Sequence, residues 1–430
     1  MFQAPRGTHD LLPEQALVRR RIVSEACTLL EGAGFGQIET PVFEDTELFT
    51  RTVGNATDIV RKEMYTFEDR SGRSLTLRPE GSAPVCRAYA EHGMHKLPQP
   101  VKLWYTGPML RYEAPQSGRY RQHAQVGAEA LGSDDPALDA ELIDLLARLF
   151  ARLGIEDVRL HLNSIGDADA RADYRRELTD FLFRSDVFDA DQRARIEVNP
   201  MRVFDWDDAG IQAITDEAPK VIDRLNDADR AHFDELRATL DGAGIDYVLD
   251  PRLVRGLDYY TRTVFEFRCD ALGAQSGIGG GGRYDRLVEQ IGGEPTPAVG
   301  WGSGLERIAQ AIEAQPGDTA PQEASEQARA VAVLFAVTEP AAKQRAFRTI
   351  SELRDEGIGA TMDFGGRSLK GQLKHASRSG ARWAVIIGPK EWEAETAAVR
   401  DLDRSEQEEI ALAHLRVELV DRTTSQGNGS

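Results

Sequence analysis

A hairpin with one polar face sets the first limit on how this chain folds. Residues 103–132, LWYTGPMLRYEAPQSGRYRQHAQVGAEALG, suit two strands that are separated by the turn-forming residues 115–118. Since residues two apart share one face of a strand, the alternation sorts the side chains. Charged and amide side chains then gather on one face: Arg111, Glu113, Arg121, His123, Gln125 and Glu129.

Two explanations of that polar face stay open on the hairpin alone. It is either the solvated face of an antiparallel sheet or the floor of a site for a polar ligand. A packed sheet core would not collect guanidinium groups, carboxylates and a carboxamide, so the face must meet water or a ligand. The rest of the chain has to decide between the two.

Length and composition indicate a soluble protein of two or three domains. The chain has 430 residues, of which 41% are hydrophobic and 29% charged. Neither a bilayer-spanning run nor the apolar core of a signal peptide is visible, so we expect a cytoplasmic protein. The distant cysteines Cys27, Cys86 and Cys269 form no CxxC pair, which predicts buried, reduced thiols rather than disulfides or a zinc site.

The charge pattern leaves the partner and the environment open. A net charge of −19 argues against nucleic-acid binding by the chain as a whole, but such a sum can hide a local basic patch. Only 8 lysines accompany 44 arginines. Many acids with few lysines suit either a high-salt cytoplasm or a GC-rich genome. If the composition reflects a high-salt cytoplasm, we expect activity to persist in molar KCl. Inactivity in molar KCl, with full activity in dilute buffer, would contradict that expectation.

Apolar periodicity predicts the elements around the hairpin. We expect helices over 14–31 and 136–154, a strand over 158–163 and a strand–turn–helix over 76–93. In the last of these, Ser82 is the expected N-cap. The carboxylate of Glu80 lies where the helix dipole favours it. Residues 166–243 are helical and highly charged, and we interpret them as an inserted helical module.

Glycines and arginines return between residues 253 and 312. Arg255 and the pair Tyr259–Tyr260 precede a predicted strand. The run Gly279–Gly282 predicts either a flexible loop or a backbone that approaches a ligand or a strand closely. Arg307 lies in the first turn of a predicted helix, where an arginine opposes the macrodipole unless an anion is near.

The last third of the chain predicts a separate α/β domain. Residues 315–329 have the composition of a linker. From residue 330 strands and helices alternate, which indicates a mixed or parallel sheet. We expect residues 396–402 to form an edge strand and residues 405–415 to form the final helix.

A basic helix face in this domain predicts a polyanionic partner. Residues 361–390 carry six basic side chains against one acid, Asp363. Three of the six, Lys370, Lys374 and Arg378, recur at helical spacing, and like charges at that spacing repel. Phosphate contacts would relieve the repulsion, so we favour a polyanion over a solvated face.

The candidate site residues share one chemistry. Arginines from separated stretches (Arg111 and Arg121, Arg255, Arg307) together with glycine-rich backbone suit a triphosphate and a reaction at phosphorus. Carboxylates beside them would bind Mg²⁺ or the amino group of a small substrate. A triphosphate site with a separate basic domain predicts an enzyme that couples ATP to RNA.

The motifs themselves resemble a known family. TLRPEGS, LRYEAPQSGRYRQHAQ and WGSGLERI resemble the amino-acid-binding segment and the second and third motifs of class II aminoacyl-tRNA synthetases. LVRGLDYYTRTVFEF and GGGGRYD resemble the two signatures of the histidyl-tRNA synthetase family, and RGTHDLLP resembles its opening. GFGQIETPVFE is similar to the first class motif, which lies at the dimer interface. The resemblance covers residues 4 to about 420 and implies a homodimer that uses ATP, Mg²⁺, L-histidine and tRNA(His).

The resemblance also implies residue roles. Arg111 and Arg255 would be catalytic, on the α-phosphate and its developing charge. ATP would contact Arg111, Glu113, Arg121 and Arg307. Histidine would contact Glu80, Ser82, Arg111, Gln125, Glu129, Arg255, Tyr259, Tyr260 and Tyr284. The tRNA would contact Gln116 and Arg119 in the hairpin loop and Lys370, Lys374 and Arg378 in the terminal domain. We expect no structural metal site.

The sequence departs from the family pattern at three places. Ser82 replaces the usual threonine but keeps the hydroxyl, Ala114 stands where arginine is common, and His123–Ala124 replaces an aromatic–histidine pair. The contact of the loop with the tRNA acceptor end therefore falls to Gln116 and Arg119.

The implied architecture is an α+β catalytic domain on an antiparallel sheet, with a helical insertion and a C-terminal α/β anticodon-binding domain. We assign residues 1–165 and 244–314 to the catalytic domain, 166–243 to the insertion, 315–329 to the linker, 330–422 to the anticodon-binding domain and 423–430 to a disordered tail. Two alternatives stay open: a non-enzymatic paralogue, such as a regulatory subunit of histidine biosynthesis, and a synthetase for another amino acid.

Overall fold

The predicted hairpin lies inside an eight-stranded, mostly antiparallel sheet. The computed structural model describes residues 2–54, 57–113, 120–206, 208–273, 276–315 and 331–424, which divide into two compact units, Met1–Asp318 and Thr319–Ser430. In sheet order, the strands of the first unit are β1 (Gly36–Gln37), β5 (Val101–Leu110), β6 (Gln122–Leu131), β11 (Ala298–Gly304), β10 (Gly277–Arg283), β9 (Thr261–Cys269), β7 (Val158–Ser164) and β8 (Tyr247–Leu249). Only the outer pairs β1–β5 and β7–β8 are parallel. This confirms the predicted antiparallel sheet.

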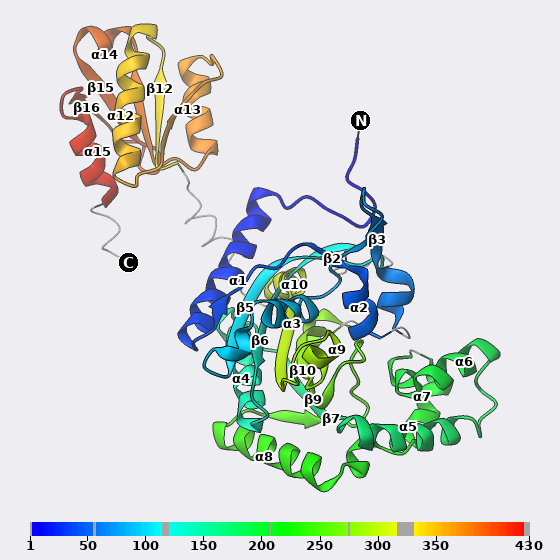
Figure 1. Ribbon diagram of the computed structural model, residues 1–430. Helices are drawn as coiled ribbons and strands as arrows, with labels where there is room; N and C mark the ends of the chain where they lie inside the picture. The colour runs from blue at the N-terminus through cyan, green and yellow to red at the C-terminus, as the bar shows by residue number, and fades with distance from the viewer. Residues whose placement is uncertain are drawn as a thin grey trace. The chain divides into compact units, whose positions relative to one another are not determined.

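Helices cover this sheet (Figure 1), and one of the longest, α4 (Pro136–Arg152), starts at a capping residue. Asp135 accepts a hydrogen bond of 2.8 Å from the N–H of Ala137, and Pro136 opens the helix, as is typical of helix N-termini. A second, three-stranded sheet of β2 (Phe43–Asp45), β4 (Ser74–Leu77) and β3 (Tyr65–Glu68) lies beside the large one. The helices are α1 (Pro13–Gly32), α2 (Thr46–Thr52), α3 (Ser82–Glu91), α4 (Pro136–Arg152), α9 (Leu287–Gln290) and α10 (Leu305–Glu313), with short turns of helix at Ile59–Glu63, Met94–Lys96 and Asp270–Leu272.

The helical insertion is present between β7 and β8. It consists of α5 (Ala168–Leu182), α6 (Ala190–Val198), η3 (Pro200–Asp205), α7 (Ala209–Asp216), η4 (Val221–Arg224) and α8 (Asp227–Ala243). In Figure 1, α5, α6 and α7 stand to one side of the large sheet, while α8 runs along its lower edge. The insertion buries its own apolar residues, among them Tyr174, Leu178 and Ile211.

The four-glycine run is a central strand and not a flexible loop. Gly279–Gly282 lie in β10, paired on both sides with β9 and β11. A Cβ atom on Gly281 would lie 1.9 Å from the carbonyl oxygen of Gly300, so only glycine permits this close approach of strands. The strand ends at Arg283, which is completely buried and forms an ion pair of 2.5 Å with the buried Asp139 of α4.

The second unit contains a five-stranded sheet in the order β13 (Ala360–Met362), β12 (Val333–Val337), β14 (Trp383–Ile387), β15 (Thr396–Asp401) and β16 (Gln407–Ala411). Its helices are η6 (Pro340–Ala342), α12 (Lys343–Asp355), α13 (Leu369–Arg378), α14 (Pro389–Glu393) and α15 (Leu415–Thr424). The sheet is mixed, as expected, because β13, β12 and β14 are parallel whereas β15 and β16 are antiparallel.

Two expectations for the end of the chain were wrong. The expected final helix over 405–415 is instead the strand β16 followed by α15, and β15 is therefore an interior strand. The sequence pattern did not predict this strand because an edge strand is solvated. Within Gln407–Ala411 only Ile410 is buried, and the other side chains are polar or small. The helix α15 extends to Thr424, into the expected disordered tail, while residues 425–430 lie outside the described residues.

Three smaller expectations can be compared with the structure. The cysteines are all free, with Cys86 and Cys269 buried, but Cys27 is only half-buried. Within the described ranges, every helix is too short or too polar to cross a bilayer. The expected linker falls almost wholly outside the described residues, apart from Gln315.

Candidate active site

Two neighbouring groups of polar side chains lie along the polar face of β6. The first lines an open cleft of about 590 Å³ and includes Arg111, Arg255 and Arg307 with Glu113, Glu266 and Glu306; we call it the arginine cleft. The second is buried and comprises Glu80 and Glu129 with Ser82, Tyr105, Tyr259 and Tyr284; we call it the carboxyl cluster. Gln125 lines the cleft, and Glu129 lies four residues deeper on the same face of β6.

The arginines of the cleft have protein partners. Arg111 donates to the carbonyl of Pro79 at 2.8 Å and lies 3.7 Å from Glu113. Arg307, in the first turn of α10 as predicted, donates to the carbonyl of Gly277 at 3.3 Å. The cleft therefore presents positive groups that are held in place, balanced by carboxylates in the same walls.

Arg255 has the strongest of these pairs. Its Nη1 lies 2.7 Å from Glu266, which is itself 2.7 Å from Arg268. Burial alone would lower the pKa of Arg255, but Glu266 and Tyr260 outweigh it and raise the pKa. Burial would likewise raise the pKa of Glu266, but the two arginines hold it below its usual value. Both groups are consequently charged, and an anionic ligand would compete with Glu266 for Arg255.

The carboxyl cluster is organised around Glu129, whose side chain is fully buried on β6. Ser82 donates to Oε1 at 2.7 Å, Tyr105 donates to the same oxygen at 3.3 Å, and Tyr284 donates to Oε2. Burial raises the pKa of Glu129 to about 8, a rise that Tyr284 and Ser82 oppose and Glu80 reinforces. A ligand that donates hydrogen bonds to this carboxyl would favour its ionised form.

Glu80 supplies the second carboxyl group. It accepts hydrogen bonds from the backbone N–H groups of Ser82 at 2.8 Å and Ala83 at 3.0 Å, and from the hydroxyl of Tyr259 at 3.3 Å. Burial raises the pKa of Glu80, although the two backbone hydrogen bonds partly oppose the rise. Ser82 was expected to cap α3, but Gly81 is the N-cap and Ser82 is the first helical residue. Glu80 takes the capping role, which frees the Ser82 hydroxyl for Glu129.

Glycines make room for this cluster. A Cβ atom on Gly300, directly opposite Glu129 in the sheet, would lie 1.6 Å from its Oε2 atom. A Cβ atom on Gly127 would lie 2.4 Å from the hydroxyl of Tyr105. The glycine-rich motifs therefore remove side chains from the face on which buried carboxyl and phenol groups meet.

The two tyrosines of the predicted pair contact each other, and Tyr259 also contacts Tyr284 of the carboxyl cluster. The rings of Tyr259 and Tyr260 are 4.8 Å apart, and the ring of Tyr284 is 5.5 Å from that of Tyr259. Burial raises the pKa of Tyr260, while the charge of Arg255 opposes the rise. The aromatic stack thus connects Arg255 with the carboxyl cluster.

Not every predicted residue joins these groups. Arg121 is not part of the cleft lining among the described residues: its guanidinium lies 3.7 Å from the ring centre of Tyr112 and donates to the carbonyl of Glu113 at 3.3 Å. Gln116, Arg119 and Ala114 lie outside the described residues. Lys370, Lys374 and Arg378 are exposed on α13 of the second unit, as their spacing predicted.

Sequence reasoning missed three residues of the site: Tyr105, Glu266 and Glu306. Glu306 accepts from the N–H of Ala124 at 3.0 Å and pairs with Arg19 at 2.7 Å, so it ties β6 to α1. Tyr105 lies opposite Gly127 in the hairpin, a pairing that a known hairpin register would have revealed. Glu266 alternates with buried residues along β9, and this polar interruption of an apolar strand was a usable signal.

Comparison with known proteins agrees with the predicted family. The family model for histidyl-tRNA synthetase matches residues 7–308, and the model for the anticodon binding domain matches residues 330–422. A histidine–tRNA ligase of Corynebacterium jeikeium is 45% identical over 425 residues, which are 99% of this chain and 94% of that protein. The histidine–tRNA ligase of Mycobacterium tuberculosis is 46% identical over 421 residues, 98% of each chain.

Solved structures support the same conclusion. The crystal structure of apo Staphylococcus aureus histidyl-tRNA synthetase has a TM-score of 0.80 and 34% identity, and the match covers 98% of this chain and 100% of that one. An ATP phosphoribosyltransferase regulatory subunit/histidyl-tRNA synthetase from Bacillus halodurans shares the fold, with a TM-score of 0.65 and 24% identity over 90% of this chain and 98% of its own. This chain belongs to the histidyl-tRNA synthetase family.

Proposed function

We propose that this chain is a histidine–tRNA ligase. It activates L-histidine with ATP to histidyl-adenylate and pyrophosphate, and then transfers histidine to the 3′-terminal adenosine of tRNA(His). The relatives named histidine–tRNA ligase, at 45% and 46% identity over almost the whole chain, support this activity. The presence of a second unit that matches the anticodon binding domain supports the tRNA step.

The carboxyl cluster is the observation that carries the proposal. Imidazole offers one N–H donor and one acceptor nitrogen, so a site that reads it needs both kinds of partner. Glu129 provides the acceptor, Gln125 on the same face of β6 provides both a donor and an acceptor, and the phenols packed around Glu129 and Glu80 provide hydroxyl groups. Because these groups are buried, an amino acid that leaves them unpaired would bind far more weakly. Glu80 and Ser82 are the proposed partners of the substrate's amino group.

The arginine cleft would carry the first chemical step. Arg111, Arg307 and Arg121 are the proposed partners of the ATP phosphates, with Glu113 near the adenine. A carboxylate oxygen of histidine attacks the α-phosphorus and pyrophosphate leaves, so negative charge develops at the α-phosphate. Arg111 and Arg255 are proposed to stabilise that charge, which is the usual source of catalysis in phosphoryl-group chemistry.

Mg²⁺ would arrive with ATP. The described residues contain no group of three or more His, Cys, Asp or Glu side chains arranged for a metal ion. Mg²⁺ commonly needs only one or two carboxylates in addition to substrate phosphates, and Glu113, Glu266 and Glu306 supply such oxygens in the cleft wall. The ion would neutralise phosphate charge; the chain's own contribution is to hold the phosphates in line with the histidine carboxylate.

The remaining assignments concern partners. Lys370, Lys374 and Arg378 are proposed to contact the phosphates of tRNA(His), and Gln116 and Arg119 its acceptor end. We also propose a cytoplasmic homodimer. Val42 and Phe43, within the segment that resembles the first class motif, are 40% and 51% exposed, and Phe67, whose ring contacts that of Phe43, is 43% exposed. A second copy would cover these apolar side chains. Light scattering of the purified chain tests the dimer.

Histidine-dependent exchange of pyrophosphate into ATP tests the proposed activity. We expect exchange with L-histidine, exchange at least about 1,000-fold weaker with other amino acids, and histidine-dependent charging of tRNA(His). Absence of exchange with histidine would contradict the proposal and favour a non-enzymatic paralogue. The presence of Arg255 and of the second unit argues against such a paralogue. Exchange with a different amino acid would indicate another synthetase.

A further inference from the structure

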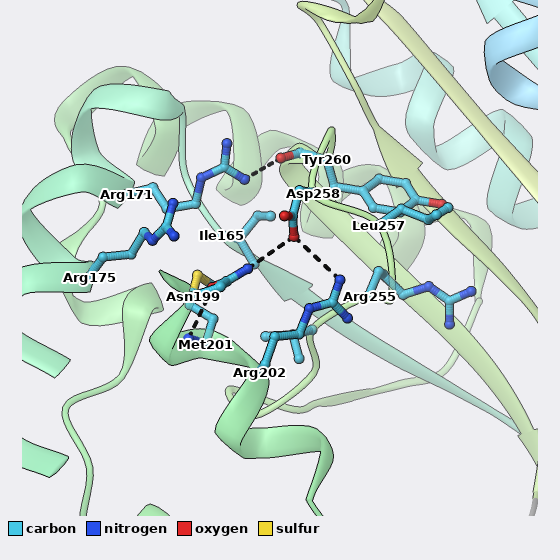
Figure 2. A pocket seen from close by; sticks show the side chains of 11 residues that line it. Ile165, Arg171, Arg175, Asn199, Met201, Arg202, Arg255, Leu257, Asp258 and Tyr260 are labelled. Carbon is cyan, nitrogen blue, oxygen red and sulfur yellow. Dashed lines mark hydrogen bonds and ion pairs between the residues drawn. The ribbon is translucent and has the colours of Figure 1, made fainter. Parts of the chain in front are cut away.

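The segment that carries Arg255 and the two site tyrosines has little regular structure of its own. Residues 253–260 form neither helix nor strand, and β9 begins only at Thr261. The shape of such a segment depends on the groups that hold it from outside. Figure 2 shows a small cavity between the segment and the helical insertion, lined by side chains of both.

Asp258 is the first anchoring point. Its Oδ1 accepts hydrogen bonds from Asn199 at 3.0 Å and from Arg202 at 3.3 Å, both at the junction of α6 and η3 in the insertion. The N–H of Asp258 also donates to the carbonyl of Val53 at 3.1 Å. In Figure 2 the carboxylate of Asp258 lies between the two insertion side chains, while Arg255 extends away from them.

Tyr260 is the second anchoring point. Its backbone carbonyl accepts a hydrogen bond from Nη1 of Arg171, on α5 of the insertion. A guanidinium bonded to a carbonyl of an irregular segment holds the chain itself, rather than one flexible side chain. The side chain of Tyr260 contacts the ring of Tyr259 at a centre-to-centre distance of 4.8 Å.

Arg262 is the third anchoring point, and its backbone is strained. Its φ angle is 49°, an uncommon left-handed value for a residue other than glycine. Its N–H donates to the carbonyl of Gly166 at 2.8 Å, its carbonyl accepts from Ile165 at 2.8 Å, and its side chain pairs with the buried Asp229 of α8 at 2.9 Å. Such strain persists only where the surroundings over-determine it.

The three anchors alternate with groups that face the active site. Asp258, the carbonyl of Tyr260 and Arg262 are held mainly by the insertion and its first residues. Arg255 faces the arginine cleft, and Tyr259 donates to Glu80 in the carboxyl cluster. Residues 253–262 are therefore fixed by the insertion on one side and face the proposed substrate sites on the other.

We propose that the helical insertion positions the catalytic segment 253–262 for histidine activation, with Arg171 as the main positioning residue. The inference rests on the proposed function, because it concerns the same adenylation site. It assigns to the insertion a task that does not need tRNA: without these anchors, Arg255 and Tyr259 would no longer be held in position beside the α-phosphate and histidine. Arg171 itself touches no substrate and acts through the backbone of Tyr260.

Histidine-dependent exchange of pyrophosphate in the full chain, without tRNA, tests the proposal with three variants. Arg171→Met removes the donor, Arg171→Lys keeps a donor, and Asn199→Ala removes one bond to Asp258 without removing a charge. Arg176→Met is the matched control: Arg176 lies on the same helix, its side chain is 79% exposed, and it pairs with the equally exposed Asp173. All four are compared with the unchanged chain at a temperature well below thermal unfolding.

We expect kcat/KM for histidine to fall at least about 10-fold in Arg171→Met and about 3-fold in Asn199→Ala, with partial recovery in Arg171→Lys. KM for ATP should stay within about twofold, because Arg111 and Arg307 lie outside the segment. Arg176→Met should match the unchanged chain.

Other results would overturn the inference. Exchange within twofold of the unchanged chain in a folded Arg171→Met would show that the anchor is dispensable. Equal losses for histidine and ATP, with no recovery in Arg171→Lys, would indicate general destabilisation in place of positioning. Absence of exchange in the unchanged chain would overturn the proposed function and this inference together.

Discussion

The arginine cleft and the carboxyl cluster lie on one face of the same strand, but they are built on opposite principles. The cleft is open, and its arginines pair with carbonyl and carboxylate oxygens of the cleft walls. The cluster is buried: Glu80 and Glu129 are 4% and 0% exposed, and the four hydroxyl groups of the cluster donate to their carboxyl oxygens.

The difference indicates which region tolerates replacement of a hydrogen-bond partner. A buried carboxyl costs folding free energy unless it is hydrogen-bonded, so the cluster can be kept only if recognition requires it. The carboxylates of the cleft border an open space, so a triphosphate can take the place of Glu113 or Glu266 beside an arginine. Specificity then belongs to the cluster and charge stabilisation to the cleft.

Loss of Arg255 should separate the two regions most clearly. Arg255→Ala is expected to lower histidine-dependent exchange by at least about 100-fold, because it removes a positive group from the developing charge. Histidine binding, measured by calorimetry without ATP, should change by less than about threefold. Near-normal exchange in this variant would refute the catalytic role.

The complementary change is Glu129→Gln. The amide keeps the shape but offers one acceptor oxygen where the carboxyl has two, and Ser82, Tyr105 and Tyr284 all donate to that group. We expect KM for histidine to rise about 10- to 100-fold, with KM for ATP nearly unchanged. Glu177→Gln, on the surface of the insertion, is the control. An equal rise of both KM values would argue against separate regions.

The same variant should change how stability depends on pH. Because folding raises the pKa of Glu129 from 4.5 to about 8, the folded chain holds more protons than the unfolded chain between these values. The free energy of unfolding therefore falls as the pH rises from 5 to 8, by up to about 1.4 kcal/mol per pH unit from this group. In Glu129→Gln the fall should be shallower, but not absent, since Glu80 contributes in the same direction. Parallel urea titrations at several pH values measure the difference, and equal slopes would contradict it.

A smaller effect is expected from Glu266→Gln. Glu266 holds Arg255 at 2.7 Å in the free site, and the neutral amide would hold it less firmly. We expect kcat for exchange to fall about fivefold, with little change in KM for histidine. A large rise in that KM would place Glu266 with the carboxyl cluster instead.

Substitutions on the basic face of α13 should have the smallest effect on tRNA charging and no effect on pyrophosphate exchange. Lys370→Ala, Lys374→Ala and Arg378→Ala are each expected to raise KM for tRNA about threefold and to make it less salt-dependent. Lys343→Ala, an exposed lysine on α12 of the same unit, is the control. Charging that is insensitive to all three changes would contradict the assignment to tRNA.

Local pattern predicted much of this molecule from its sequence. Alternation placed Gln125 and Glu129 on one face of a hairpin, and Arg307 falls in the first turn of α10 as expected. These two predictions succeeded because the alternation of a strand and the start of a helix depend on residues that are close together in the sequence.

Contacts between distant segments could not be predicted in this way. The pair Arg255–Glu266 and the place of Tyr105 depend on strand register, which single-sequence pattern does not determine. Ser82 has the residue type of an N-cap, but Gly81 caps the helix while Glu80 accepts the backbone N–H groups. Strand β16 was mistaken for a helix because a solvated edge strand shows too few buried residues to reveal its period.

Calorimetric titration of L-histidine into Arg255→Ala and Glu129→Gln, side by side and without ATP, tests the division between the two regions most directly. We predict affinity close to that of the unchanged chain for Arg255→Ala and affinity at least about 10-fold weaker for Glu129→Gln. Weak binding by Arg255→Ala together with normal binding by Glu129→Gln would contradict the account.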